Sequence, residues 1–167
     1  DSFYIDPVLW AVEEGITSGT TATTFHPGGV CVRAQVVTFL WRAAGSPEPA
    51  NAVNPFVDVA MDEYYCKAVM WAYEKGITAG IDETHFGPSA ECTRAQVVTF
   101  LWRYLEQPQP TVTGHPFTDV TEDQFCFVPM LWAVENGITS GMTATTFAPN
   151  AICNRAQVVT FLYRALA

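Results

Sequence analysis

One stretch of sequence occurs three times in this chain of 167 residues, and its copies are 61 positions apart. The first copy reads GITSGTTATTFHPGGVCVRAQVVTFLWR, and similar copies begin at Gly76 and Gly137. A repeat of this period is typical of arrays in which each copy is one small supersecondary unit. We therefore expect three similar units, joined by proline-rich connectors. Their expected boundaries are residues 1–45, 54–106 and 115–167.

Each unit is predicted to be a helix, a loop and a second helix. A short apolar segment (PVLWAVEE in the first unit) is followed by Gly-Ile, the pattern of a left-handed helix C-terminus with its apolar contact. The segment RAQVVTFLWR predicts the second helix. Thr93 and Asn154 are suitable N-caps for it, whereas Val32 has no side-chain acceptor. The sequence thus indicates an all-α fold.

The second helices are apolar over much of their surface, which one helix pair cannot bury. Neighbouring units must cover them, either as an open solenoid or as a ring closed about a pseudo-threefold axis. A solenoid needs polar caps on its terminal repeats, and the first and last units have nearly the same apolar positions. This similarity favours closure. The first unit lacks the F-x-D-V opening of the other two, so we expect the sequence to begin inside a repeat.

Composition excludes several functions. The formal net charge of −9 argues against binding to nucleic acid or to an anionic membrane. We find neither an apolar run long enough to span a bilayer nor a signal peptide. The sequence has no recognisable nucleophile, metal-binding or phosphate-binding motif, and a catalytic site in triplicate within one small domain would be unusual. We expect a binding module rather than an enzyme, with no cofactor and no metal.

Arginines occupy two of the repeated positions. One set lies at the end of the second helix, where a cation suits the helix dipole: Arg42, Arg103 and Arg164. The other set lies at its start, where a cation is unfavourable by about 0.3–1 kcal/mol: Arg33, Arg94 and Arg155. Two explanations remain open. The charge could pair with an internal carboxylate, such as Asp58 or Asp119, or bind an external anion together with free N–H groups of the helix start.

Other repeated residues are weaker candidates. The glutamines favour helix capping over ligand contact, and the glycines of G-I-T-x-G favour a turn, although they would also let a ligand approach the backbone. These candidates are Gln35, Gln96, Gln157, Gly19, Gly80 and Gly141. The repeated tryptophans favour the core over a sugar-stacking role. We interpret Tyr64, Tyr65 and Phe125 as packing residues and the histidines as surface residues.

The chain has five cysteines, and their spacing suggests two disulfides. The expected pairs, each within one unit, are Cys66–Cys92 and Cys126–Cys153, which leave Cys31 unpaired. Such pairs would fit an extracytoplasmic setting. The alternative is that all five are buried thiols that only pack.

The order F-x-D-V, W-A helix, G-I-T-x-G, T-F-x-P and T-R-A-Q resembles the S-layer homology domain, as three tandem motifs that cover essentially the whole chain. Here glutamine stands where the family's T-R-A-E tetrad has an acidic residue. The resemblance implies a pseudo-trimeric spindle around a central three-helix bundle. It also implies non-covalent anchoring to the bacterial cell wall, through grooves that bind a pyruvylated N-acetylmannosamine polysaccharide.

By position, the resemblance makes Arg33, Arg94 and Arg155 the residues that contact the pyruvate carboxylate. The glycines would line the grooves. Because Val32 and the missing opening depart from the family pattern, we expect fewer than three equal sites. The alternative function is a surface-exposed module that binds a protein, as an adhesin does, with structural arginines. The parent protein could carry further domains.

Overall fold

The computed structural model describes residues 2–51 and 53–167, and these residues form six α-helices and no β-strand. Each motif contributes one short helix and one longer helix. The short helices are α1 (Ile5–Glu13), α3 (Cys66–Glu74) and α5 (Phe127–Glu135). The longer helices are α2 (Arg33–Ala43), α4 (Arg94–Tyr104) and α6 (Arg155–Leu166). The predicted all-α class is therefore confirmed. Within the described residues, no helix has the length and apolar character needed to cross a membrane.

The short helices end as predicted. At the end of α1, Gly15 adopts a positive φ of 69°, and the Ile16 N–H donates to the Ala11 carbonyl. This is the hydrogen-bond pattern of a left-handed helix cap, and the Ile16 side chain is buried beside it. Gly76 and Gly137 repeat the geometry with φ values of 69° and 68°. The chain is thereby turned from each short helix into the loop that precedes the longer one.

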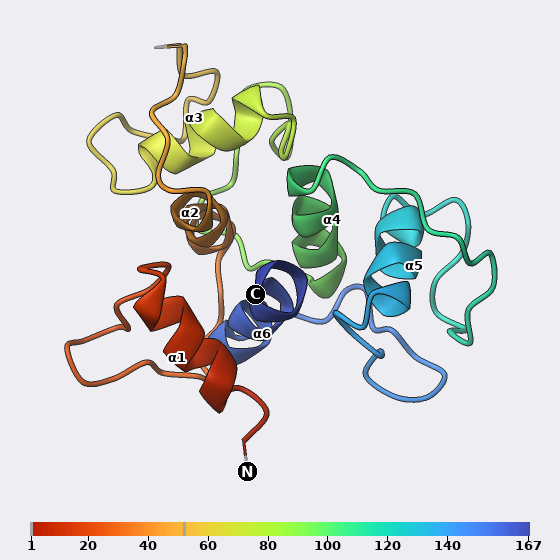
Figure 1. Ribbon diagram of the computed structural model, residues 1–167. Coiled ribbons are helices and arrows are strands. Elements are labelled where there is room, and N and C mark those ends of the chain that lie inside the picture. Colours follow the sequence, from red (N-terminus) through yellow and green to blue (C-terminus); the bar gives the residue numbers. More distant parts are fainter. Residues whose placement is uncertain (1, 52) are drawn as a thin grey trace.

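The two helices of a motif pack mainly against neighbouring motifs. The short helix α3 lies against α2, α5 lies against α4, and α1 lies against α6 at the other end of the chain. Figure 1 shows α2, α4 and α6 at the centre, with α1, α3 and α5 outside them. Each motif therefore covers the apolar surface of the motif before it, and the third motif is covered by the first.

Backbone hydrogen bonds close this arrangement into a ring. The Cys31 N–H donates to the Cys153 carbonyl, Cys92 donates to Cys31, and Cys153 donates to Cys92, each over 3.0 Å. The three cysteines are fully buried at this junction. A cycle of three equivalent bonds requires that the first and last motifs meet. Closure about a pseudo-threefold axis, rather than an open solenoid, is confirmed.

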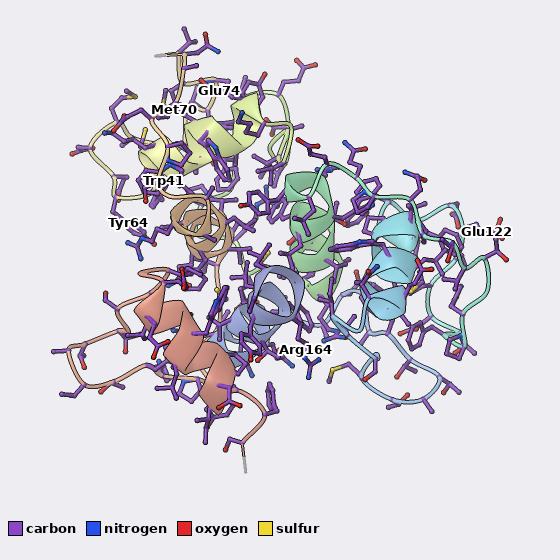
Figure 2. All side chains as sticks on the ribbon, in the orientation of Figure 1. Trp41, Tyr64, Met70, Glu74, Glu122 and Arg164 are labelled. Atoms are coloured by element: carbon purple, nitrogen blue, oxygen red, sulfur yellow. The ribbon has the colours of Figure 1, made fainter. Side chains whose placement is uncertain are left out.

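The core fills the space between the central and outer helices with side chains from every motif (Figure 2). Trp71 and Trp132 are buried, as predicted, and Trp10 is partly buried against the same core. The longer helices contribute a repeated set of core positions, and Val37, Leu40 and their repeats have almost no exposed surface. This core holds the starts of α2, α4 and α6 in fixed positions.

Candidate functional site

The arginines at the helix starts reach across the boundary into the next motif. Arg33 Nε donates to the Phe86 carbonyl over 2.9 Å, and Arg94 Nε donates to the Phe147 carbonyl over 2.9 Å. Arg155 Nε donates to the Phe25 carbonyl over 3.0 Å, which joins the third motif to the first. All three side chains are buried, and Arg33 is only 3% exposed. Each arginine therefore belongs to a boundary between two motifs.

Aromatic rings enclose each guanidinium. The central carbon of the Arg33 guanidinium lies 4.8 Å from the Phe86 ring centroid and 5.3 Å from the Phe100 ring centroid. Arg94 and Arg155 lie between equivalent ring pairs. A cation over an aromatic face is attracted by the electrons of the ring. Burial nonetheless lowers the pKa of Arg33, an effect that neighbouring Cys92 and Asp58 partly oppose.

The helix starts do not offer free N–H groups as the sequence suggested. The Arg33 N–H donates to the Ala90 carbonyl over 2.9 Å, and the Ala34 N–H donates to the Pro88 carbonyl over 3.1 Å. The same two bonds occur at the starts of α4 and α6. Because loop carbonyls of the next motif already satisfy these donors, a ligand at the boundary would meet the guanidinium rather than the backbone.

The aspartates of the F-x-D-V segments do not form ion pairs with the arginines. Asp58 accepts hydrogen bonds from the N–H groups of Phe86 (2.9 Å) and Gly87 (2.8 Å), and Asp119 does the same for Phe147 and Ala148. Among the described residues, Lys67 and Glu48 form an ion pair, and His85 Nδ1 lies 3.0 Å from Asp82 Oδ1. Direct pairing with Asp58 or Asp119, one of the two explanations that the sequence left open, is therefore not observed. Each aspartate instead braces the loop whose carbonyl accepts from the arginine.

The environment of Asp119 supports this bracing role. Burial alone would raise the pKa of its carboxyl group, but backbone N–H donors, chiefly those of Phe147 and Ala148, together with the charge of Arg94, outweigh burial and lower that pKa. The carboxylate is therefore favoured in the folded protein. For the loop that contains Phe25, the position equivalent to Asp58 would lie before residue 1. The 167 residues therefore include such an aspartate for two of the three loops.

The glutamines cap the helices, as their pattern favoured. Gln35, Gln96 and Gln157 each accept a hydrogen bond from the N–H of the residue before the helix, over 3.0–3.1 Å. Thr93 and Asn154 complete the capping by accepting from the N3 N–H, whereas Val32 makes no side-chain cap. The absence of a side-chain cap at Val32, expected from the sequence, is confirmed.

The glycines of the G-I-T-x-G turns have no room for a side chain. Gly80 has φ 88°, and a Cβ there would lie 2.5 Å from the carbonyl oxygens of Asp82 and His85. Gly19 and Gly141 have similarly positive φ values and close backbone neighbours. Their first role is thus to allow the turn, and Gly19 and Gly80 also line grooves.

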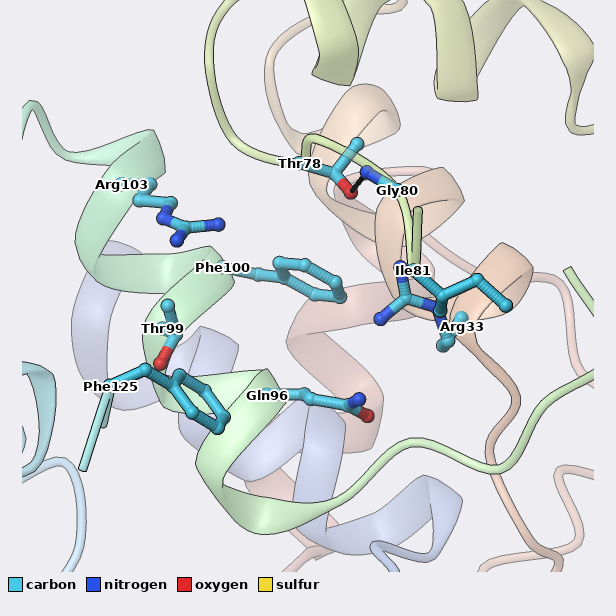
Figure 3. A pocket seen from close by; sticks show the side chains of 9 residues that line it. All are labelled: Arg33, Thr78, Gly80, Ile81, Gln96, Thr99, Phe100, Arg103 and Phe125. Carbon is cyan, nitrogen blue, oxygen red and sulfur yellow. Dashed lines mark hydrogen bonds between the residues drawn. The ribbon is translucent and has the colours of Figure 1, made fainter. Parts of the chain in front are cut away.

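Parts of three motifs form one groove of about 410 Å³, which we call the Arg33 groove (Figure 3). The first motif supplies Arg33, the second supplies its turn and one side of α4, and the third supplies one aromatic ring. The lining residues are Arg33, Thr78, Gly80, Ile81, Gln96, Thr99, Phe100, Arg103 and Phe125. The structure thus brings Arg33, Gly80 and Gln96 together although they come from different motifs.

The pseudo-threefold relation repeats this arrangement in a smaller groove of about 170 Å³, which we call the Arg155 groove. Its lining residues are Thr17, Ser18, Gly19, Gln35, Thr38, Phe39, Arg42, Tyr64 and Arg155. Here the arginine comes from the third motif, the turn from the first and the aromatic ring from the second. The two grooves are lined mostly by residues at equivalent positions of the repeat, and they differ in volume.

The three guanidinium groups differ in their second contact. Arg94 Nη2 donates to Thr139 Oγ1 over 3.1 Å, and Arg155 Nη2 donates to Thr17 Oγ1 over 3.4 Å. Arg33 Nη2 is buried and has no hydrogen-bond partner within the described part of the chain. A buried donor without a partner costs about 1–3 kcal/mol. Arg33 Nη2 therefore has unused hydrogen-bonding capacity, and the guanidinium to which it belongs lines the Arg33 groove.

Several groove residues were not predicted from the sequence. Tyr64 and Phe125 are 59% and 64% exposed and line the two grooves, so their interpretation as packing residues is wrong. Arg42 and Arg103 also line the grooves, and each donates to the carbonyl of the isoleucine in its own G-I-T turn. All four occupy positions that repeat at 61 residues, which is the signal that could have identified them.

The predicted disulfides are absent from the structure, where all five cysteines, each in the described part of the chain, are free and buried. Cys66 Sγ lies 3.7 Å from Met70 Sδ at the start of α3, whereas Cys92 lies in the ring of backbone bonds with Cys31 and Cys153. Pairing by spacing within a motif failed because the second cysteine of each motif lies at the axis. Across the described residues, no group of three or more His, Cys, Asp or Glu side chains could hold a metal ion.

Comparison with known families gives the same division into three. The S-layer homology domain model matches residues 1–37, 55–98 and 116–159, which together are more than half of the chain. Each matched segment contains one short helix and the start of the following longer helix.

Individual proteins are also similar. A cell surface protein of Thermoanaerobacter kivui is 32% identical over 69% of this chain and 16% of its own length. An S-layer protein of Bacillus thuringiensis subsp. finitimus is 32% identical over 73% of this chain and 15% of its own length. A cellulosome-anchoring protein of Acetivibrio thermocellus is 26% identical over 85% of this chain and 33% of its own length. The chain thus matches a third or less of the length of each.

These matches support a location at the cell surface. The chain belongs to the S-layer homology domain family, of which it contains three tandem motifs.

Proposed function

We propose that this chain anchors its parent protein to the bacterial cell wall by binding an anionic wall polysaccharide in the grooves between motifs. The ligand class proposed is a secondary cell-wall polymer that carries pyruvylated N-acetylmannosamine. The observation that carries the proposal is the Arg33 guanidinium, which lines a groove of about 410 Å³ and whose buried Nη2 has no partner in the described residues. The family and its cell-surface relatives support the same role.

The chemistry of the groove suits a carboxylate on a sugar. A guanidinium is planar and can donate two parallel hydrogen bonds to a carboxylate, which a lysine cannot do. Arg33 Nε is already used by the Phe86 carbonyl, so the ligand would meet the two terminal nitrogens of the guanidinium, of which Nη2 has no partner among the described residues. Gln96 adds a polar group for hydroxyl or acetamido groups, and Arg103 adds a second positive charge. The groove therefore offers contacts for both parts of such a sugar.

The test is binding of the chain to wall sacculi that contain pyruvylated polymer. Polymer-stripped sacculi are the control for the ligand. Arg33→Met removes the guanidinium and retains much of the side-chain volume. Lys67→Met is the matched control, because it removes one exposed charge on α3 outside the lining of either groove. Circular dichroism verifies that each variant is folded.

We expect binding to intact sacculi alone, and a loss of affinity at the Arg33 groove of roughly 10- to 100-fold in Arg33→Met. Lys67→Met should bind as the unaltered chain does. Binding that persists on stripped sacculi would overturn the polysaccharide ligand and point to a protein partner. Binding that requires the polymer but is unaffected by Arg33→Met would remove Arg33 from the site.

A further inference from the structure

An exposed aromatic ring lines each of the two grooves, and in both it comes from the motif that supplies neither the arginine nor the turn. Phe125 has this place in the Arg33 groove, and Tyr64 has it in the Arg155 groove. The two positions are 61 residues apart, and both side chains are more than half exposed. The rings are thus a repeated element of the groove and not isolated surface residues.

Packing within the protein does not account for this exposure. Burial of apolar surface stabilises a protein by about 25 cal/mol for each Å² removed from water. An aromatic side chain that stays exposed to solvent therefore contributes little to the stability of the fold. The neighbouring Cys126 is almost completely buried, which shows that this segment has core positions available. Single exposed apolar residues are common on proteins, but two at equivalent places in two equivalent grooves require another explanation.

The Arg33 groove has two chemically different ends. Figure 3 shows Phe125 and Thr99 at one side and the Arg33 guanidinium at the other, with Gln96 of α4 between them in this view. A charged donor at one end suits a carboxylate. A flat apolar face at the other end suits the C–H face of a sugar ring, which is attracted to the negative face of an aromatic ring. Both features occur in a pyranose that carries a carboxylate.

We propose that Phe125 is a stacking platform for a sugar ring whose carboxylate is bound by Arg33, and that Tyr64 has the same role in the Arg155 groove. This inference rests on the proposed function. It adds to each binding site the one motif that supplies neither the arginine nor the turn. A groove would then require contributions from all three motifs, so ring closure would be a condition for binding as well as for stability.

The experiment is an amide NMR titration with a glycoside of pyruvylated N-acetylmannosamine as the probe. The Gly80 amide reports the Arg33 groove and the Gly19 amide reports the Arg155 groove, since each glycine lines only one of the two. The variants are Phe125→Leu, Phe125→Trp and Tyr64→Leu. Leucine keeps an apolar side chain but removes the aromatic face, whereas tryptophan keeps that face. Both original side chains are exposed, so folding should persist, and the amide spectrum verifies it.

We expect Phe125→Leu to weaken the titration of Gly80 about 10-fold and to leave that of Gly19 unchanged. Tyr64→Leu should do the reverse, and Phe125→Trp should bind at least as well as the unaltered chain. Ring-current shifts of the sugar C–H protons should weaken in each leucine variant, because only the other groove retains its aromatic ring. Free pyruvate, which has no sugar ring, should bind equally to the unaltered chain and Phe125→Leu.

Two results would overturn the inference, and they are distinguishable. If Phe125→Leu binds the probe normally while Arg33→Met does not, the aromatic ring is not a platform, and the proposed function stands. If the unaltered chain does not bind the probe in either groove, the proposed ligand itself is wrong and the platform falls with it.

Discussion

The arginines at the helix starts combine a structural role with the proposed binding role in one side chain. Arg33 Nε holds the next motif through the Phe86 carbonyl, while Nη2 has no partner among the described residues. Carbonyl oxygens and aromatic faces stabilise the buried positive charge but do not neutralise it. A paired carboxylate would neutralise it. A guanidinium has five N–H donors and can therefore perform both tasks, which explains why an arginine rather than a lysine suits this position.

At the same scale, the cysteines provide a prediction about reactivity. Burial raises the pKa of Cys31 and Cys153 to about 12 and also raises that of Cys92, so these thiols stay protonated at neutral pH. Because the thiolate is the reactive form, the native protein should react very slowly with a thiol reagent at pH 8. After unfolding in denaturant without reductant, all five thiols should react.

The measurement is a thiol count with Ellman's reagent before and after addition of denaturant. A sample reduced beforehand is the control and should give the same final count. A count of one in the unreduced, unfolded sample would contradict the structure and restore the two disulfides expected from the sequence.

At the scale of the element, local signals predicted the helices and their ends correctly. Gly15 and Thr93 act through residues only a few positions away, so their roles can be inferred from sequence alone. The partners of each helix could not be inferred in this way. Tyr64 and Cys92 were misinterpreted because their surroundings come from other motifs, and the repeat shows that motifs are equivalent without showing which surfaces meet.

The start of α2 allows an almost isosteric test of capping. Val32 has the extended conformation of an N-cap (φ −90°, ψ 161°) but no acceptor, whereas Thr93 accepts from the Gln96 N–H over 3.3 Å. Val32→Thr adds this acceptor with little change in shape. It should raise the free energy of unfolding by about 0.5–1 kcal/mol, and Thr93→Val should lower it by a similar amount. Urea unfolding of both variants measures the two changes.

The two substitutions act as controls for each other, since the same pair of side chains is exchanged in opposite directions at equivalent sites. If both changes destabilise the protein, the apolar contacts of Val32 outweigh the missing cap. Capping would then not be the property that distinguishes the first motif.

At the scale of the whole molecule, closure makes the three motifs interdependent. Helix α1 packs against α6 from the other end of the chain. The carbonyl that accepts a hydrogen bond from Arg155 belongs to Phe25, which is 130 residues away in the sequence. An open array loses only one interface when a terminal repeat is removed. A ring of three loses two of its three interfaces, and the remaining pair cannot replace them. Stability should therefore be a property of the ring rather than a sum over motifs.

A chain divided in the second connector tests this dependence. The division falls after Pro110, which leaves the hydrogen bond from Trp102 to the Pro108 carbonyl intact. In fragment 1–110, α1 lacks α6, and Arg94 lacks the Phe147 carbonyl. We expect this fragment to show no cooperative unfolding transition by near-ultraviolet circular dichroism. Mixing it with fragment 111–167 should restore the transition, because the two pieces contain every contact of the ring.

A chain that contains a protease site after Pro110 and is cleaved once folded serves as the control for the cut itself. A cooperative transition in fragment 1–110 alone would show that two motifs are enough for a stable fold. Stability would then increase with each added motif, as in an open solenoid, even though the ring is closed.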